Sequence, residues 1–159
     1  MRLVEILTPE SLRVPIVSVS KEDAIRELID HLPLEGETAL RREIQDSVLE
    51  RERSLSTGIG DGIAIPHGKA DVSGTLGAFG VCRSPIPFDS IDGHPVRILF
   101  LVVTRPEETD RHLLALGALS AFLTRGETRD AVLACKTSES LWNLLQNGGP
   151  PGPAHQGPA

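Results

Sequence analysis

The feature that most constrains the fold of this chain is an unbroken apolar run of six residues from Ile98 to Val103. Such a run is too short to cross a lipid bilayer. It fits a β-strand that is buried on both faces, because a strand with one wet face alternates apolar and polar residues. The run therefore predicts a sheet that is covered by further layers of structure on both faces.

Helical patterns precede this run. Ser20, with Asp23 three residues further on, resembles a capping box and opens a predicted helix. Its apolar residues recur at helical spacing, at positions 24, 25, 28, 29 and 32. A second helix is predicted from Thr38 to about Arg51 or Arg53, with apolar residues along one stripe.

Strand and helix patterns follow in the rest of the chain. The predicted strands span residues 62–66, 75–82 and 96–103. The predicted helices after them span residues 109–123, 127–135 and 138–146, with Gly126 as the C-terminal stop of the first. This order predicts an α/β fold, a single domain over residues 1–146 with a mixed β-sheet flanked by helices on both faces. Residues 147–159 are rich in glycine and proline, which predicts a flexible tail.

Composition and charge exclude several classes of function. The net charge of −6 argues against nucleic acid as a partner, because phosphate backbones need a basic footprint. The first residues lack the apolar core of a signal peptide, so we expect a cytoplasmic protein with no direct membrane insertion. Cys82 and Cys135 are expected to be buried small hydrophobes rather than a disulfide or a metal site.

The segment from Ser56 to Gly68 carries the strongest functional signal. It reads STGIGDGIAIPHG, with three glycines at alternate positions before a short apolar strand and a histidine directly behind a proline. Alternate glycines let another group approach the backbone closely. A neutral imidazole, with an ordinary pKa of about 6.5, is a competent nucleophile at cell pH. Backbone N–H groups and the Ser56 and Thr57 hydroxyls suit an anion, so we interpret His67 as a phosphohistidine site; the alternative is an ordinary core or surface histidine.

Two further residues complete this hypothesis. His112 lies on the same helical stripe as Leu116, Leu119 and Leu123, so it is expected to face the sheet at the N-terminal end of its helix, where an anion would meet free N–H groups. The alternative is a buried histidine bonded to a carbonyl. Arg51 is a candidate to place a guanidinium beside a phosphoryl group, although arginines at helix ends are usually solvated.

Other catalytic motifs are absent from the sequence. Ile63 stands where the dinucleotide fingerprint needs its third glycine, and Ala70 follows Gly68-Lys69 where a nucleotide P-loop needs serine or threonine. No cysteine or histidine pair has metal-ligand spacing, and there is no G-x-S-x-G elbow. We therefore expect neither a metal nor a cofactor.

The combined pattern resembles a known family. Arg51-Glu52, followed by the stretch from Ser56 to Lys69, is similar to the signature of the EIIA component of the bacterial phosphoenolpyruvate-dependent phosphotransferase system, in the fructose–mannitol class that includes the nitrogen-regulatory EIIA proteins. The segments Pro87–Val96 and His112–Leu116 resemble later parts of the same family. The resemblance extends from about Ile6 to Leu145.

This resemblance implies a phosphocarrier without bound metal or cofactor. The family's motif histidine, which maps onto His67, accepts a phosphoryl group on Nε2 from phospho-HPr or its nitrogen-branch counterpart. In sugar uptake it passes the group to a cysteine of an EIIB domain. The helper arginine maps onto Arg51 and the second active-site histidine onto His112.

The resemblance leaves three interpretations of the protein's role. A stand-alone EIIA can serve sugar transport, or it can be a nitrogen-regulatory protein whose phosphorylation state decides which target proteins it binds. A relative that has kept the fold and lost phosphorylation is the third interpretation, and the intact stretch from Ser56 to Lys69 argues against it.

Overall fold

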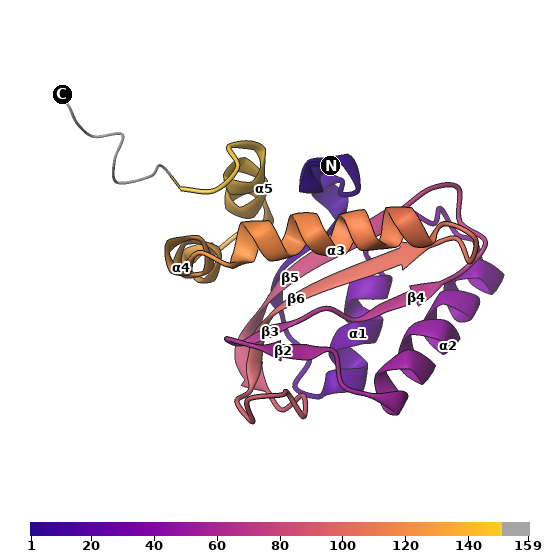
Figure 1. Cartoon of the computed structure of the whole chain (residues 1–159), viewed down its shortest axis with the longest axis horizontal. Coiled ribbons are helices and arrows are strands. Elements are labelled where there is room, and N and C mark those ends of the chain that lie inside the picture. The colour runs from indigo at the N-terminus through magenta and orange to yellow at the C-terminus, as the bar shows by residue number, and fades with distance from the viewer. Residues whose placement is uncertain (151–159) are drawn as a thin grey trace.

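The apolar run lies within β6 (Val96–Thr104), the central strand of a six-stranded sheet in the computed structural model, which describes residues 1–150 (Figure 1). The run's side chains enter two hydrophobic cores alternately, Leu99, Leu101 and Val103 on one face and Ile98, Phe100 and Val102 on the other. All six are at most 1% exposed, so the predicted burial on both faces is confirmed. Of the tail predicted over residues 147–159, residues 151–159 lie outside the part of the chain that the structure describes.

The sheet is mixed, as predicted. Its other strands are β1 (Leu12–Ile16), β2 (Gly58–Gly60), β3 (Ile63–Ala64), β4 (His67–Lys69) and β5 (Leu76–Ile86). The strand order is β1-β5-β6-β3-β2, and β4 also pairs with β6. The β5–β6 and β2–β3 pairs are antiparallel, whereas β1 is parallel to β5 and both β3 and β4 are parallel to β6.

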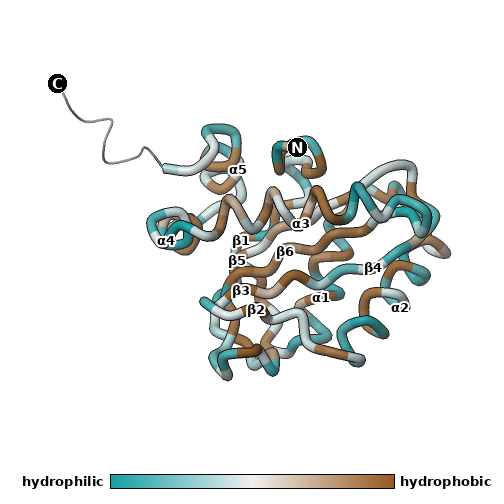
Figure 2. The backbone as a smooth tube through the Cα atoms, in the orientation of Figure 1, coloured by the Kyte–Doolittle hydropathy of each residue, from teal (hydrophilic) through white to brown (hydrophobic). Residues whose placement is uncertain are grey.

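Helices cover both faces of this sheet (Figure 1). They are α1 (Lys21–Ile29), α2 (Thr38–Ser54), α3 (Thr109–Leu123), α4 (Gly126–Ala134) and α5 (Ser138–Gln146), and the short 3₁₀ turns Leu3–Glu5 and Pro9–Ser11 precede β1. The first two helices share one core with the sheet and the last three share the other. Figure 2 shows apolar residues along the central strands β3 and β6, between these helical layers. Within residues 1–150, no helix is both long and apolar enough to span a membrane.

The strand predicted at residues 62–66 is shorter in the structure. It consists of the shorter β3, and the chain then pairs again as β4, so His67 begins a strand and does not merely follow one. The two pieces share one register along β6, with Ile63 opposite Ile98 and His67 opposite Val102. Pro66 has no N–H to donate, but its carbonyl accepts the Val102 N–H at 3.1 Å and carries the register across the break.

The helix ends show which local signals were correct. Ser20 caps α1, with its hydroxyl accepting the Asp23 N–H at 3.3 Å. The prediction that Gly126 stops α3 is wrong, because α3 ends at Leu123 and Gly126 is the first residue of α4. Arg129 performs the expected task instead, donating from Nη1 to the carbonyls of Leu123 and Thr124 at 2.8 and 2.9 Å.

Candidate functional site

His67 opens β4 beside β6, with a half-buried ring. Its Nδ1 lies 2.9 Å from the carbonyl oxygen of Ile65, two residues earlier. A carbonyl only accepts, so this contact is a hydrogen bond when Nδ1 carries the proton. That tautomer leaves Nε2 with a free lone pair, which is what a nucleophile requires.

His112 lies next to His67, as the sequence predicts. The two ring centroids are 4.9 Å apart, and the rings meet edge to face at 62°. His112 comes from the N-terminal part of α3, where its backbone N–H makes the first helical bond, to the Glu108 carbonyl at 3.2 Å. Further along the same stripe Leu119 and Leu123 are buried, which fixes this face of α3 against the sheet. The His112 Nδ1 is buried and has no hydrogen-bond partner within residues 1–150.

Burial and nearby cations keep both imidazoles neutral. Burial lowers the pKa of His67, the charges of Arg51 and Lys69 lower it further, and the Ile65 carbonyl and the Glu52 carboxylate act in the opposite direction. Burial also lowers the pKa of His112, followed by the effects of His67, Lys69 and Arg51. The site therefore combines neutral imidazoles at neutral pH with the positive charges of Arg51 and Lys69.

Sequence reasoning missed Lys69 as a part of this site. Its positive charge lowers the pKa of both His67 and His112. Residues i and i+2 of a strand point to the same face, so β4 places Lys69 on the face of His67, but residues 67–69 carry no strand pattern in the sequence that could have predicted this. The Lys69 backbone N–H donates to Ser47 Oγ of α2 at 2.9 Å, which ties β4 to that helix.

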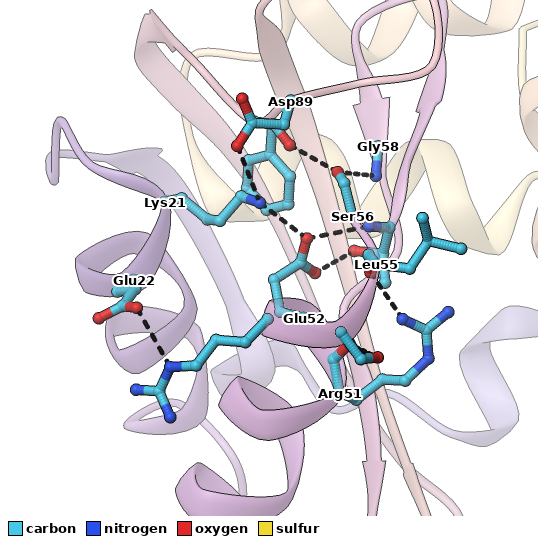
Figure 3. Close-up of polar contacts among 12 residues, drawn as sticks. Lys21, Glu22, Arg51, Glu52, Leu55, Ser56, Gly58 and Asp89 are labelled. Atoms are coloured by element: carbon cyan, nitrogen blue, oxygen red, sulfur yellow. Dashed lines mark hydrogen bonds and ion pairs between the residues drawn. The ribbon is translucent and has the colours of Figure 1, made fainter.

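Arg51 lies in the last turn of α2, where its Nη1 donates to the Leu55 carbonyl at 2.6 Å (Figure 3). This bond holds the guanidinium at the end of the helix, half-buried rather than fully solvated. Its positive charge lowers the pKa of both His67 and His112. The structure thus brings His67 and His112 into contact, and Arg51 acts on both through its charge.

The two predicted hydroxyl donors are engaged elsewhere in this conformation. Ser56 Oγ donates to the Phe88 carbonyl at 2.5 Å and accepts the Gly58 N–H at 3.0 Å (Figure 3). Thr57 Oγ1 donates to Glu52 Oε1 at 2.5 Å, and the Thr57 N–H donates to Glu52 Oε2 at 2.9 Å. These contacts fix the segment that leads to the histidine, and direct phosphate binding by either hydroxyl stays a prediction.

Close approach explains two of the glycines. A Cβ on Gly58 would overlap the side chain of Ser90, so the group that approaches this backbone is the connection between β5 and β6. A Cβ on Gly68 would lie 2.8 Å from Ser47 Oγ and 2.9 Å from Val48 N, because β4 packs directly on α2. At these two positions the glycines serve packing that supports the site.

Comparison with known proteins identifies the family to which this fold belongs. A sequence model of the family described as "Phosphoenolpyruvate-dependent sugar phosphotransferase system, EIIA 2" matches residues 5–148. The chain belongs to this family, a component of the phosphotransferase system with a general phosphocarrier role. The resemblance inferred from the sequence is confirmed over nearly the expected range.

Individual relatives come from both branches of the family. The chain is 34% identical over 146 residues to the fructose-specific EIIABC component of Bacillus subtilis, covering 91% of this chain and 23% of that protein. It is 32% identical over 152 residues to a nitrogen regulatory protein of Pseudomonas aeruginosa, covering 93% and 99%. The solved structure of nitrogen regulatory protein IIA-Ntr from Neisseria meningitidis superposes with a TM-score of 0.80 at 30% identity, covering 89% of this chain and 97% of that one.

Proposed function

We propose that His67 accepts a phosphoryl group on Nε2 from the phosphohistidine of HPr or of its nitrogen-branch counterpart, and passes it to an acceptor protein. The observation that carries this proposal is the 2.9 Å contact between His67 Nδ1 and the Ile65 carbonyl. It turns the other nitrogen, Nε2, into the nucleophile and supports a single position for the phosphoryl group.

The transfer step balances without any further reactant. The Nε2 lone pair forms a bond to phosphorus while the bond from phosphorus to the donor's histidine nitrogen breaks, and that electron pair returns to the donor ring. Attack through Nε2 leaves positive charge on the His67 ring, and the Ile65 carbonyl stabilises it through the proton on Nδ1. The same contact assists the reverse step, in which the group leaves for the next acceptor.

The surrounding charges suit the phosphoryl oxygens. Phosphoryl transfer needs positioning and neutralisation of the equatorial oxygens rather than covalent help. Arg51 and Lys69 supply two positive charges, and the edge-on imidazole of His112 supplies a ring nitrogen at short range. All three come from different elements, α2, β4 and α3, so the intact fold is needed to assemble them.

Partner docking is expected on apolar surface beside the site. Leu113 and Leu114 follow His112 on α3 and are 60% and 53% exposed, and Leu55, whose carbonyl holds Arg51, is 69% exposed. Exposed leucines around a charged centre suit a protein partner that must bind and leave. The same face would receive the donor first and an EIIB domain or a regulatory target afterwards.

The test uses phosphoenolpyruvate, Enzyme I and HPr with the intact mass of this protein as the readout. We expect the wild-type chain to gain one phosphoryl group and His67→Gln to gain none. His94→Gln removes an exposed histidine of the β5–β6 connection and is the matched control, which should be labelled normally. Labelling of His67→Gln, or no labelling of the wild-type chain, would overturn the proposal.

A regulatory role is the second candidate. It is supported by the 32% identity to the Pseudomonas aeruginosa nitrogen regulatory protein and by the TM-score of 0.80 with IIA-Ntr from Neisseria meningitidis. In this role the phosphoryl group adds about two negative charges to the docking face and changes which proteins bind there. Affinity measurements on purified candidate targets with both forms of the protein test it, and identical affinities would exclude a switch.

A further inference from the structure

A buried carboxylate, that of Glu52, follows Arg51 in the last turn of α2. The Glu52 side chain is 3% exposed, and three donors surround it (Figure 3). Two of them belong to Thr57, at 2.5 and 2.9 Å, and the third is Lys21 Nζ of α1 at 3.1 Å. A buried charge is retained only where partners compensate its lost hydration, and here both carboxylate oxygens are engaged.

This carboxylate is connected to the His67 ring by consecutive hydrogen bonds. Glu52 holds the backbone N–H and the hydroxyl of Thr57. The Thr57 carbonyl accepts the Ile65 N–H at 3.0 Å, and the Ile65 carbonyl lies 2.9 Å from His67 Nδ1. Each contact holds one backbone group of a residue whose carbonyl, in the adjoining peptide, makes the next contact, so a shift of Glu52 is passed on to the Ile65 carbonyl.

Glu52 also helps to position Arg51. Glu52 follows Arg51 in the last turn of α2, and the chain from there to Thr57 forms the turn that leads into β2. Arg51 Nη1 bonds the Leu55 carbonyl inside this turn. One buried ion pair therefore secures both ends of the segment that positions the cation and the nucleophile.

We propose that Glu52, neutralised by Lys21, is a positioning residue that holds His67 in its Nδ1–H tautomer through Thr57 and Ile65, and holds Arg51 beside it. The part of this inference that concerns transfer rate rests on the proposed function. The part that concerns the tautomer depends on the fold alone, so it is tested whether or not the protein is phosphorylated.

Glu27 provides a matched control. Its side chain is 13% exposed and it pairs with Arg13 Nε at 2.6 Å. It also accepts the N–H groups of Val17 and Ser18, both at 3.0 Å, so it anchors the segment after β1 as Glu52 anchors the segment before β2. No hydrogen-bond path of this kind leads from Glu27 to His67 among the described residues. Substitution at either glutamate disturbs an ion pair that also anchors backbone N–H groups, and only Glu52 is linked to His67 by hydrogen bonds.

The experiment compares Glu52→Gln with Glu27→Gln in the full chain. Long-range ¹H–¹⁵N spectra report the His67 tautomer, and single-turnover labelling by phospho-HPr reports the transfer rate of the folded fraction. We expect Glu52→Gln to lose the predominance of the Nδ1–H tautomer and to slow transfer roughly 10- to 100-fold, the scale of a catalytic group displaced by about 1 Å. Glu27→Gln should retain both properties of the wild-type chain.

A second pair of variants covers the case in which Glu52→Gln does not fold. Thr57→Val deletes the hydroxyl bond to Glu52 and leaves the ion pair between Glu52 and Lys21, whereas Thr57→Ser keeps a hydroxyl donor at this position. We expect Thr57→Val to shift the tautomer and slow transfer in the same direction, and Thr57→Ser to recover both. A wild-type tautomer or rate in the folded Glu52→Gln or Thr57→Val protein, or equal losses in Glu27→Gln, would overturn the proposal. An unlabelled wild-type chain with the expected tautomer shift would overturn only the phosphocarrier function.

Discussion

The contact between β4 and α2 supports the site, and Gly68→Ala tests it. The added Cβ would lie 2.8 Å from Val48 Cγ2 and Ser47 Oγ and 2.9 Å from Val48 N. Carbon atoms pack comfortably at about 3.5–4.0 Å, so the strand and the helix must separate by roughly 0.5–1 Å. Val48 N belongs to the backbone and cannot rotate away. Overpacking of this kind costs about 1–3 kcal/mol of stability.

The same substitution weakens the neighbouring hydrogen bond from the Lys69 N–H to Ser47 Oγ, which adds about 1 kcal/mol. We therefore expect Gly68→Ala to lower the free energy of unfolding by about 2–4 kcal/mol in a urea titration. Gly117→Ala is the control, because within residues 1–150 a Cβ there would meet no atom within 4 Å apart from the backbone of its own helix. Alanine within helix α3 should raise stability by up to about 1 kcal/mol. A Gly68→Ala protein within about 0.5 kcal/mol of wild type would refute this account of the packing.

Three further predictions follow from burial. His67 and His112 have a folded-state pKa below the ordinary 6.5, so just below that pH the unfolded chain binds more protons than the folded chain. The urea midpoint of unfolding should therefore fall as the pH drops below 6.5. A midpoint that does not change with pH would contradict the pKa directions. Cys82 is 1% exposed, and burial raises the pKa of its thiol to about 12, whereas Cys135 is half-buried. A thiol reagent should therefore label Cys135 alone in the native protein, and both cysteines after unfolding in urea. Labelling of Cys82 in the native protein would contradict this. Gly58→Ala should displace the connection between β5 and β6 and lower the urea stability by about 1–3 kcal/mol, and an unchanged midpoint would contradict that overlap.

Local patterns in the sequence were sufficient for much of the fold. The helix predicted at residues 109–123 has those bounds in the structure, because its apolar stripe is regular and buries against the sheet. The uninterrupted apolar run of β6 likewise identified the centre of the sheet. The strand β1 was missed because it is short and contains Pro15, which weakens any strand pattern.

The predicted site followed from the same local patterns, but its supporting contacts did not. His67-Gly68-Lys69 has no strand pattern of its own, and it forms β4 only because Val102 to Thr104 offer a partner in register. Glu52 has the pattern of a surface residue of an amphipathic helix, and it is buried because Thr57, in the turn after the helix, and Lys21, distant in sequence, enclose it. Contacts of this kind arise from tertiary packing and carry no periodic signal.

The central claim is that Nε2 of His67 carries the phosphoryl group. The most direct measurement is a ¹⁵N–³¹P correlation spectrum of the protein after incubation with phosphoenolpyruvate, Enzyme I and HPr. We predict a single phosphorus–nitrogen coupling, to Nε2 of His67, because Nδ1 is held by the Ile65 carbonyl. A coupling to Nδ1, to His112 or to any other residue would contradict the account.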